Sequence, residues 1–160
     1  MMYLFNRQTG LMIAALVLLL DAITKGWVLE HRFELPFSVV DGWLAMVLAW
    51  NRGMSFSLLN DAGHWGPWVL GGIAVAASAW FVHWLGESKH ILHQLGLGLI
   101  IGGAVGNLLD RIQHGAVVDF ILFYHGEWAF PAFNVADSAI SVGVVVLLAH
   151  ALWYNTPNNA

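Results

Sequence analysis

Hydrophobic residues occur in four long runs along the chain, and shorter polar segments separate the runs. The runs cover residues 11–29, 67–85, 91–109 and 136–153. A helix needs about 20 mostly apolar residues to cross the hydrocarbon core of a bilayer. The pattern therefore predicts an all-α membrane protein, built as a bundle of four transmembrane helices.

Two of the connecting segments carry strand signals. The connection at residues 30–64 is long for a segment without structure of its own. Within it, Asp41-Gly42 lies between apolar residues, which predicts a β-hairpin. Residues 117–123 are a second candidate strand. We expect a small β-hairpin or cradle at one membrane face, one domain over residues 1–160, and an unstructured polar tail at 154–160.

The composition supports a membrane protein and excludes several other classes. Hydrophobic residues make up 59% of the chain and charged residues 10%, against roughly 45–50% and 25% in soluble domains. The formal net charge is −4, so there is no basic surface for nucleic acid. The chain has no cysteine, which excludes a disulfide, a thiol nucleophile and a cysteine zinc site. Asp21 follows the first apolar run where a signal peptide would carry small residues, so we expect this run to be retained.

Polar residues gather on one side of the predicted membrane. With four spans, the end of the first, the long connection, the end of the third and the start of the fourth share one side. These segments contain Asp21, Lys25, Asn51, Arg52, Asn107, Asp110, Arg111, Asp119, Asn134 and Asp137. Basic residues outside the spans are nearly balanced between the two sides, so the positive-inside rule does not orient the protein.

Each charged residue has a structural and a functional interpretation. A charge at the centre of a membrane helix costs about 2.5–3.5 kcal/mol on insertion scales, which makes such residues functional candidates. Asp21 and Lys25 are four residues apart and can form an ion pair or contact substrate. Asp110 and Arg111 are adjacent, so each needs a partner elsewhere, as residues that clamp a bundle do.

Asp119 and Asp137 are the candidates for direct chemistry. Asp119 lies inside the predicted strand, where it is either a solvated strand residue or a functional carboxylate. Asp137 opens the fourth span, where it is either a helix cap or a functional group. Two carboxylates brought together share a proton, and one can then activate a water while the other acts as an acid.

Other chemistries have weaker signals. No HExxH motif is present, which excludes a zinc protease of that type. Gly53-Met54-Ser55-Phe56 is similar to the nucleophile segment of intramembrane serine proteases, with His83, His114 or His150 as a possible base. His90 and His93 are three residues apart and are either a metal-binding pair or solvated residues.

Glycines recur in the third span. Gly98, Gly102 and Gly106 form two overlapping GxxxG spacings. This spacing allows a neighbouring helix backbone to approach closely. A phosphate-binding loop is the alternative, but no strand precedes these glycines and no basic residue is near.

Five motifs resemble those of the lipoprotein signal peptidase (signal peptidase II) family, the bacterial membrane aspartyl peptidases. They occur in the family's order between residues 11 and 153: Asp21-Ala22-Ile23-Thr24-Lys25, Asn51-Arg52-Gly53-Met54-Ser55-Phe56, Gly106-Asn107-Leu108-Leu109-Asp110-Arg111, Val118-Asp119-Phe120 and Phe133-Asn134-Val135-Ala136-Asp137. One position departs from the pattern, because Ala22 stands where the family usually has Gln.

The resemblance implies an activity and a set of site residues. Asp119 and Asp137 would be the catalytic pair that activates water to cleave a diacylglyceryl-modified prolipoprotein just before its lipidated cysteine. The substrate-binding and supporting residues would be Asp21, Lys25, Asn51, Gly53, Asn107, Asp110, Arg111, Asn134 and Ala136. The resemblance also implies no metal or cofactor, contact with membrane lipid, and a site near the outer leaflet of the bacterial cytoplasmic (inner) membrane. We expect a monomer.

Two other functional classes fit a polar cluster inside a helix bundle. A small proton-coupled transporter or channel also places Asp, His and Asn in its interior, but such proteins commonly show internal repeats, and none is evident here. A noncatalytic membrane scaffold would use Asp119 and Asp137 only as a solvated residue and a cap.

Overall fold

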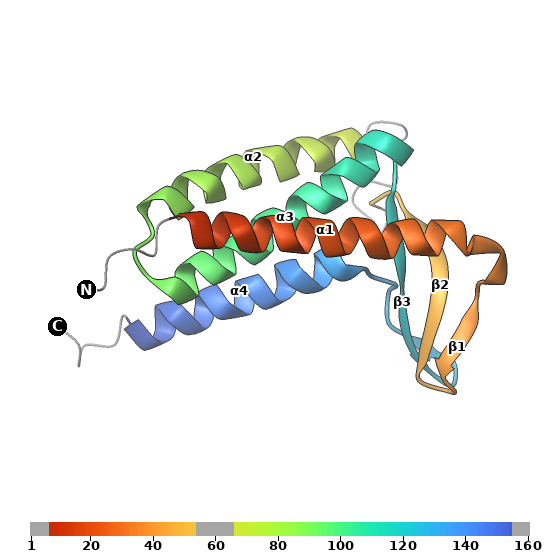
Figure 1. Cartoon of the computed structure of the whole chain (residues 1–160). Coiled ribbons are helices and arrows are strands. Elements are labelled where there is room, and N and C mark those ends of the chain that lie inside the picture. The colour runs from red at the N-terminus through yellow and green to blue at the C-terminus, as the bar shows by residue number, and fades with distance from the viewer. Residues whose placement is uncertain (1–6, 54–65, 155–160) are drawn as a thin grey trace.

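The computed structural model describes residues 7–53 and 66–154. The elements follow one another as α1 (Gln8–Glu30), the 3-10 turn η1 (Arg32–Glu34), β1 (Phe37–Val40), β2 (Leu44–Asn51), α2 (Gly66–Glu87), α3 (Ile91–His114), β3 (Val117–His125), β4 (Trp128–Ala129) and α4 (Val135–Tyr154). In Figure 1 the four helices lie alongside one another and the strands stand at one end of the bundle.

Within the described residues, four helices are long and apolar enough to cross a membrane, as the sequence predicts. The candidate spans are Gln8–Glu30, Trp68–Glu87, Ile91–His114 and Val135–Trp153. Each contains nearly all of a predicted run, and α1 and α3 extend further into polar sequence because backbone hydrogen bonding continues past the apolar residues. The predicted tail began at residue 154, but α4 includes Tyr154; residues 155–160 lie outside the described part.

The predicted hairpin forms, and it belongs to a larger sheet than expected. The four strands are antiparallel in the order β1-β2-β3-β4. Val40 pairs with Leu44 across the Asp41-Gly42 turn, where Gly42 has a φ of +77°. Strand β2 also pairs with β3, which places Ala49 opposite Asp119 and Asn51 opposite Val117. Neither β4 nor η1 is signalled by the sequence, because both are very short.

Helix α3 lies between α1 and α4, and its glycines allow close approach, as the GxxxG spacing predicts. A Cβ added to Gly98 would lie 2.5 Å from the carbonyl oxygen of Gly10, and one added to Gly102 would lie 2.6 Å from that of Ala14. Real Cβ atoms do not come so close, so these positions accept only glycine without a shift of α1. The GxxxG glycines are therefore helix-packing residues.

An apolar cluster joins the sheet to the helices. Val28 at the end of α1 and Val118 and Phe120 on β3 are almost fully buried together. Burial of such side chains is worth roughly 1.5–3 kcal/mol each. Residues Val117–Phe120 of β3 are all buried, whereas the later residues of the strand are partly exposed. The buried half of β3 therefore holds Asp119 against the ends of the helices.

Candidate active site

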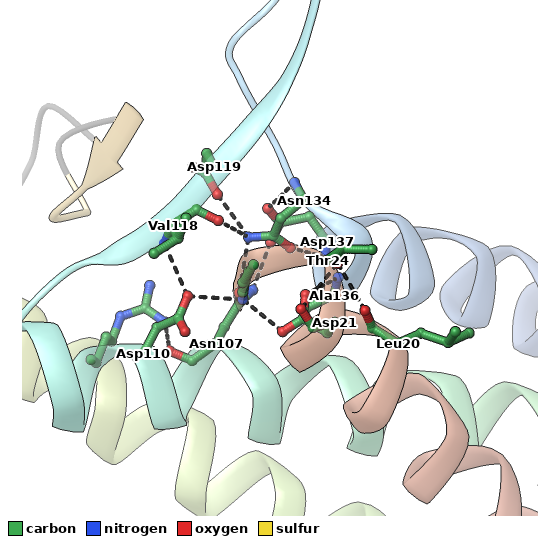
Figure 2. A network of polar contacts seen from close by, with 12 residues as sticks. Leu20, Asp21, Thr24, Asn107, Asp110, Val118, Asp119, Asn134, Ala136 and Asp137 are labelled. Carbon is green, nitrogen blue, oxygen red and sulfur yellow. Dashed lines mark hydrogen bonds and ion pairs between the residues drawn. The ribbon is translucent and has the colours of Figure 1, made fainter. Parts of the chain in front are cut away.

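Nine of the predicted site residues lie where the bundle meets the sheet, and Figure 2 labels all of them except Lys25 and Arg111. They come from four parts of the chain: the second half of α1, the end of α3, the buried half of β3 and the start of α4. In that order they are Asp21, Lys25, Asn107, Asp110, Arg111, Asp119, Asn134, Ala136 and Asp137.

Lys25 lies at the centre of a buried group of charges. Its Nζ is 2.7 Å from Oδ2 of Asp21 and 2.9 Å from Oδ2 of Asp110. It also donates a hydrogen bond of 3.1 Å to Oδ1 of Asn107. These contacts engage all three N–H donors of an ammonium group. Of the two interpretations of Asp21 and Lys25, the geometry matches the ion pair, and we call Asp21, Lys25 and Asp110 the ion triad.

Backbone groups fix both carboxylates of the ion triad. The N–H of Ala136 donates to Oδ1 of Asp21 at 2.9 Å, and the N–H of Val118 donates to Oδ2 of Asp110 at 2.9 Å. The triad thereby joins α1 and α3 to the start of α4 and to β3. Sequence reasoning did not single out Val118 as a binding partner, because every residue has the same backbone N–H.

Two linked asparagines connect the ion triad to the candidate catalytic carboxylates. Nδ2 of Asn134 donates to Oδ1 of Asn107 at 3.1 Å and to Oδ1 of Asp119 at 2.7 Å. Nδ2 of Asn107 donates to Oδ1 of Asp137 at 2.7 Å. Asp119 and Asp137 are therefore held by two amides that also contact each other, although they come from different elements.

Asp137 caps α4, which is one of the two interpretations of its position. Asn134 precedes the first residue of α4 and accepts a bond of 2.9 Å from the N–H of Asp137, while Oδ2 of Asp137 accepts one of 3.3 Å from the N–H of Asn134. This reciprocal arrangement is a capping box, in which two side chains satisfy free N–H groups at a helix start. The remaining oxygen, Oδ1, faces Asn107, so Asp137 is both a cap and a member of the network.

Asp119 is not the solvated strand residue that was one interpretation of its position, because it is only 1% exposed. Burial raises the pKa of Asp119 to about 6, since a charge is poorly solvated there. A hydrogen bond from Asn51 opposes this rise, whereas the negative charge of Asp137 adds to it. Asp119 thus titrates close to neutral pH, as acid–base groups in enzymes often do.

Arg111 and Asp110 point to different partners, as their adjacency predicts. Nη1 of Arg111 donates a bond of 3.1 Å to the carbonyl oxygen of Asn107. Its Nε is buried and has no hydrogen-bond partner among the described residues. The guanidinium therefore hydrogen-bonds the backbone near the end of α3, and its Nε–H remains an available donor beside the site.

Asn51 and Gly53 lie at the end of β2, next to β3. The N–H of Gly53 donates to Oδ1 of Asn51 at 2.8 Å, which orients the amide that bonds Asp119. Gly53 has a φ of +91°, and a Cβ there would overlap the side chain of Leu70. The predicted site residues of this motif are thus in place. Residues 54–56, including the candidate nucleophile Ser55, lie outside the described part of the chain.

The candidate histidine bases do not gather around the site. His83 pairs with Glu87 near the end of α2, and His150 is near the end of α4, both at the opposite end of the bundle. His114 packs edge-on against Trp50, with ring centroids 5.5 Å apart.

His90 and His93 are both partly buried, beside His150. Both pack against His150, with ring centroids 4.7 and 5.4 Å from it, and His93 bonds Oγ of Ser88. Among residues 7–53 and 66–154, no three His, Cys, Asp or Glu side chains are placed to hold a metal ion.

The fold and the site define a multi-pass membrane protein with buried carboxylates at one end of its bundle. A model of the family described as signal peptidase (SPase) II matches residues 13–153. The chain belongs to this family, and it is therefore a membrane protease rather than a transporter or a scaffold.

Relatives and solved structures agree with this assignment. The lipoprotein signal peptidase of Pseudoalteromonas atlantica is 39% identical over 147 residues, which cover 89% of this chain and 90% of that protein. That of Methylobacterium sp. is 40% identical and covers 94% of this chain and 93% of that protein. A bacterial membrane enzyme solved by the in meso method at 1.9 Å is 26% identical, with a TM-score of 0.80, over 98% of this chain and 99% of that one.

Proposed function

We propose that this protein is an aspartyl endopeptidase that removes the signal peptide from diacylglyceryl-modified prolipoproteins, cutting just before the lipidated cysteine. The observation that carries the proposal is the linked pair Asn107 and Asn134, which bonds Asp137 on one side and Asp119 on the other. Family membership and the names of the relatives support the substrate class.

In the proposed mechanism, the two carboxyl groups share one proton. The raised pKa of Asp119 favours the proton on that residue, while Asp137 accepts N–H bonds on both oxygens. Asp137 takes a proton from a water whose oxygen attacks the scissile carbonyl carbon, and Asp119 donates its proton to the carbonyl oxygen. Asp137 then passes its proton to the leaving amine, and Asp119 takes back a proton from a hydroxyl of the tetrahedral intermediate. The C–N bond breaks, the new end of the chain is a carboxylic acid, and the pair again holds one proton.

The supporting residues keep these carboxyl groups in place. Lys25 and Asp21 fix Asn107 and the start of α4, and Asp110 fixes β3 through the N–H of Val118. We assign the buried Nε of Arg111 and the end of β2 at Asn51 and Gly53 to binding of the substrate backbone. The reaction as proposed uses no metal or cofactor.

The position of the sheet fits a substrate that stays anchored in the bilayer. Trp43 in the hairpin turn and Phe123 and Trp128 on the strands are exposed, and aromatic side chains favour the membrane interface. We propose that the lipid chains remain among membrane lipids while the sheet cradles the peptide, and that the enzyme acts as a monomer and a single domain. The site then faces the outer leaflet of the bacterial cytoplasmic (inner) membrane.

The test compares cleavage of a lipidated prolipoprotein by the purified protein and two variants, Asp119→Asn and Asp137→Asn, in liposomes with a metal chelator present. Each variant should lose about 10²–10⁴-fold in activity, which is the usual contribution of a positioned acid or base. Asp41→Asn is the matched control, because Asp41 is an exposed carboxylate in the hairpin turn, and it should keep full activity.

Two outcomes would contradict the proposal. Full activity of either folded variant would show that its carboxylate is not catalytic. Loss of cleavage by the wild type on addition of the chelator, with recovery on addition of a metal, would replace the aspartyl pair with metal chemistry.

A further inference from the structure

A cavity adjoins the ion triad between α1 and α3. We call it the notch; its volume is about 150 Å³. Asp21, Lys25 and Asp110 line its inner part, and Gln113 and His114 line it near the end of α3. Neither Asp119 nor Asp137 is among its lining residues, so the notch reaches the network at the ion triad and not at the candidate catalytic pair.

The notch exists because small residues face it from α1. Ala22 and Gly26 both line it. A Cβ added to Gly26 would have no atom within 4 Å, so the space beside it is open. Ala22 stands where the family motif usually has the much longer Gln. A helix with larger side chains at these two positions would fill the space.

Asp110 brings a carboxylate to the wall of the notch. Its Oδ2 faces both Lys25 and the N–H of Val118, so both contacts fall on one of the two carboxylate oxygens. The side chain is only 10% exposed. A carboxylate that is so little exposed needs hydrogen bonds in place of bulk water, and ordered water commonly supplies them in polar cavities.

The notch has the size and the connection to solvent that water requires. One water molecule takes up about 30 Å³ in the liquid, so a few molecules fit. Gln113 and His114 are exposed at the last residues of α3, where that helix leaves the predicted membrane. From Leu18 to Leu29 along α1, the notch spans roughly 16 Å at 1.5 Å per residue.

We propose that the notch binds a short file of ordered water, which donates to Oδ1 of Asp110 and connects the ion triad to solvent. Ala22 is the residue that keeps this site open. The competing occupant is an acyl chain of a membrane lipid, which would leave Asp110 without its donor.

The first experiment uses the absence of cysteine from the chain. Ala22→Cys and Ile23→Cys each introduce a single thiol, at nearly the same depth in the membrane. Ile23 does not line the notch and is 58% exposed on the apolar outside of α1. The probe is a small, charged, water-soluble methanethiosulfonate, applied to protein in liposomes, because it reacts with thiolates and these form only where water solvates them.

If water fills the notch, Ala22→Cys should react at least about tenfold faster than Ile23→Cys. The thiol at position 22 would then contact water, whereas the thiol at position 23 would contact lipid. Equally slow reaction would mean that lipid fills the notch. Equally fast reaction would mean that the whole of this helix surface is wet. Either result overturns the proposal, and neither depends on the catalytic assignment.

A second pair of variants tests the role of the water. Ala22→Leu fills the notch with a group that cannot donate to Asp110, and it should lower the melting temperature by about 2–4 °C or more. Ile23→Leu is the control with a similar change outside the notch and should leave it unchanged. An unchanged melting temperature for Ala22→Leu would show that no water is needed at Asp110.

Discussion

The burial of Asp119 destabilises the folded protein when this residue is ionised, and the same burial suits it to acid–base chemistry. It is 1% exposed on a strand whose neighbours are apolar, and its pKa is raised to about 6. A raised pKa means that folding favours the protonated carboxyl group over the ionised one, relative to the unfolded chain. The same property allows it to hold a proton near neutral pH and to donate it to a substrate.

This pKa predicts a pH dependence of stability. Asp119 ionises near 3.8 when unfolded and near 6 when folded, so it lowers the stability of the fold as the pH rises through this range. The cost at pH 8 is roughly 3 kcal/mol, at about 1.4 kcal/mol for each pH unit between the two values. Asp119→Asn is neutral at every pH and avoids the cost. We expect the melting temperature of this variant, relative to the wild type, to rise between pH 4 and pH 8; a constant or falling difference would contradict the assignment.

At the scale of elements, α3 is the helix against which α1, α2 and α4 all pack. Its glycines bring the backbone of α1 against it, and its last turns carry Asn107, Asp110 and Arg111 to the site. Packing between membrane helices relies on such close backbone contact, because lipid provides no hydrophobic drive for helices to associate. The position of the site residues on α3 therefore depends on Gly98 and Gly102, which lie roughly one to four turns before them.

This dependence predicts opposite effects for two glycine substitutions. Gly102→Ala forces a methyl group against the carbonyl oxygen of Ala14 and should destabilise the protein by about 1–3 kcal/mol. Gly72→Ala on α2 is the control, because its Cβ meets no atom within 4 Å; it should be neutral or stabilising by up to about 1 kcal/mol, from helix propensity. Thermal unfolding in detergent measures both, and equal effects would exclude the packing role.

At the scale of the whole molecule, the ion triad is where the elements meet. Lys25 on α1 contacts two residues of α3, and its partner carboxylates bind backbone N–H groups of α4 and β3. Buried ion pairs add little net stability, but removal of one partner leaves an uncompensated charge. The triad thus fixes how the helices and the sheet are placed relative to one another.

Removal of Lys25 should therefore affect the whole protein. Lys25→Met keeps a similar side-chain length but leaves Asp21 and Asp110 buried without their cation, at an expected cost of about 3–5 kcal/mol. Lys89→Met is the matched control at an exposed position and should change stability by less than about 0.5 kcal/mol. An effect of Lys25→Met as small as that of Lys89→Met would show that the ion triad does not hold these elements together.

The sequence by itself determined the four helices, the hairpin turn and the identity of the clustered polar residues. These features are local: an apolar run of sufficient length predicts a span, and Asp41-Gly42 predicts a turn, without knowledge of any distant residue. The order of the spans also places the polar residues on one membrane side, because each span reverses the chain.

Only the tertiary structure decided which of these residues meet and what each contributes. The pairing of β2 with β3, the bond from Ala136 to Asp21 across 115 residues of chain and the link between Asn107 and Asn134 are all non-local. The burial of Asp119 and the notch beside Ala22 depend on how helices and sheet pack. Sequence patterns record the local preferences of the backbone, whereas these contacts arise from side chains that meet only once the chain has folded.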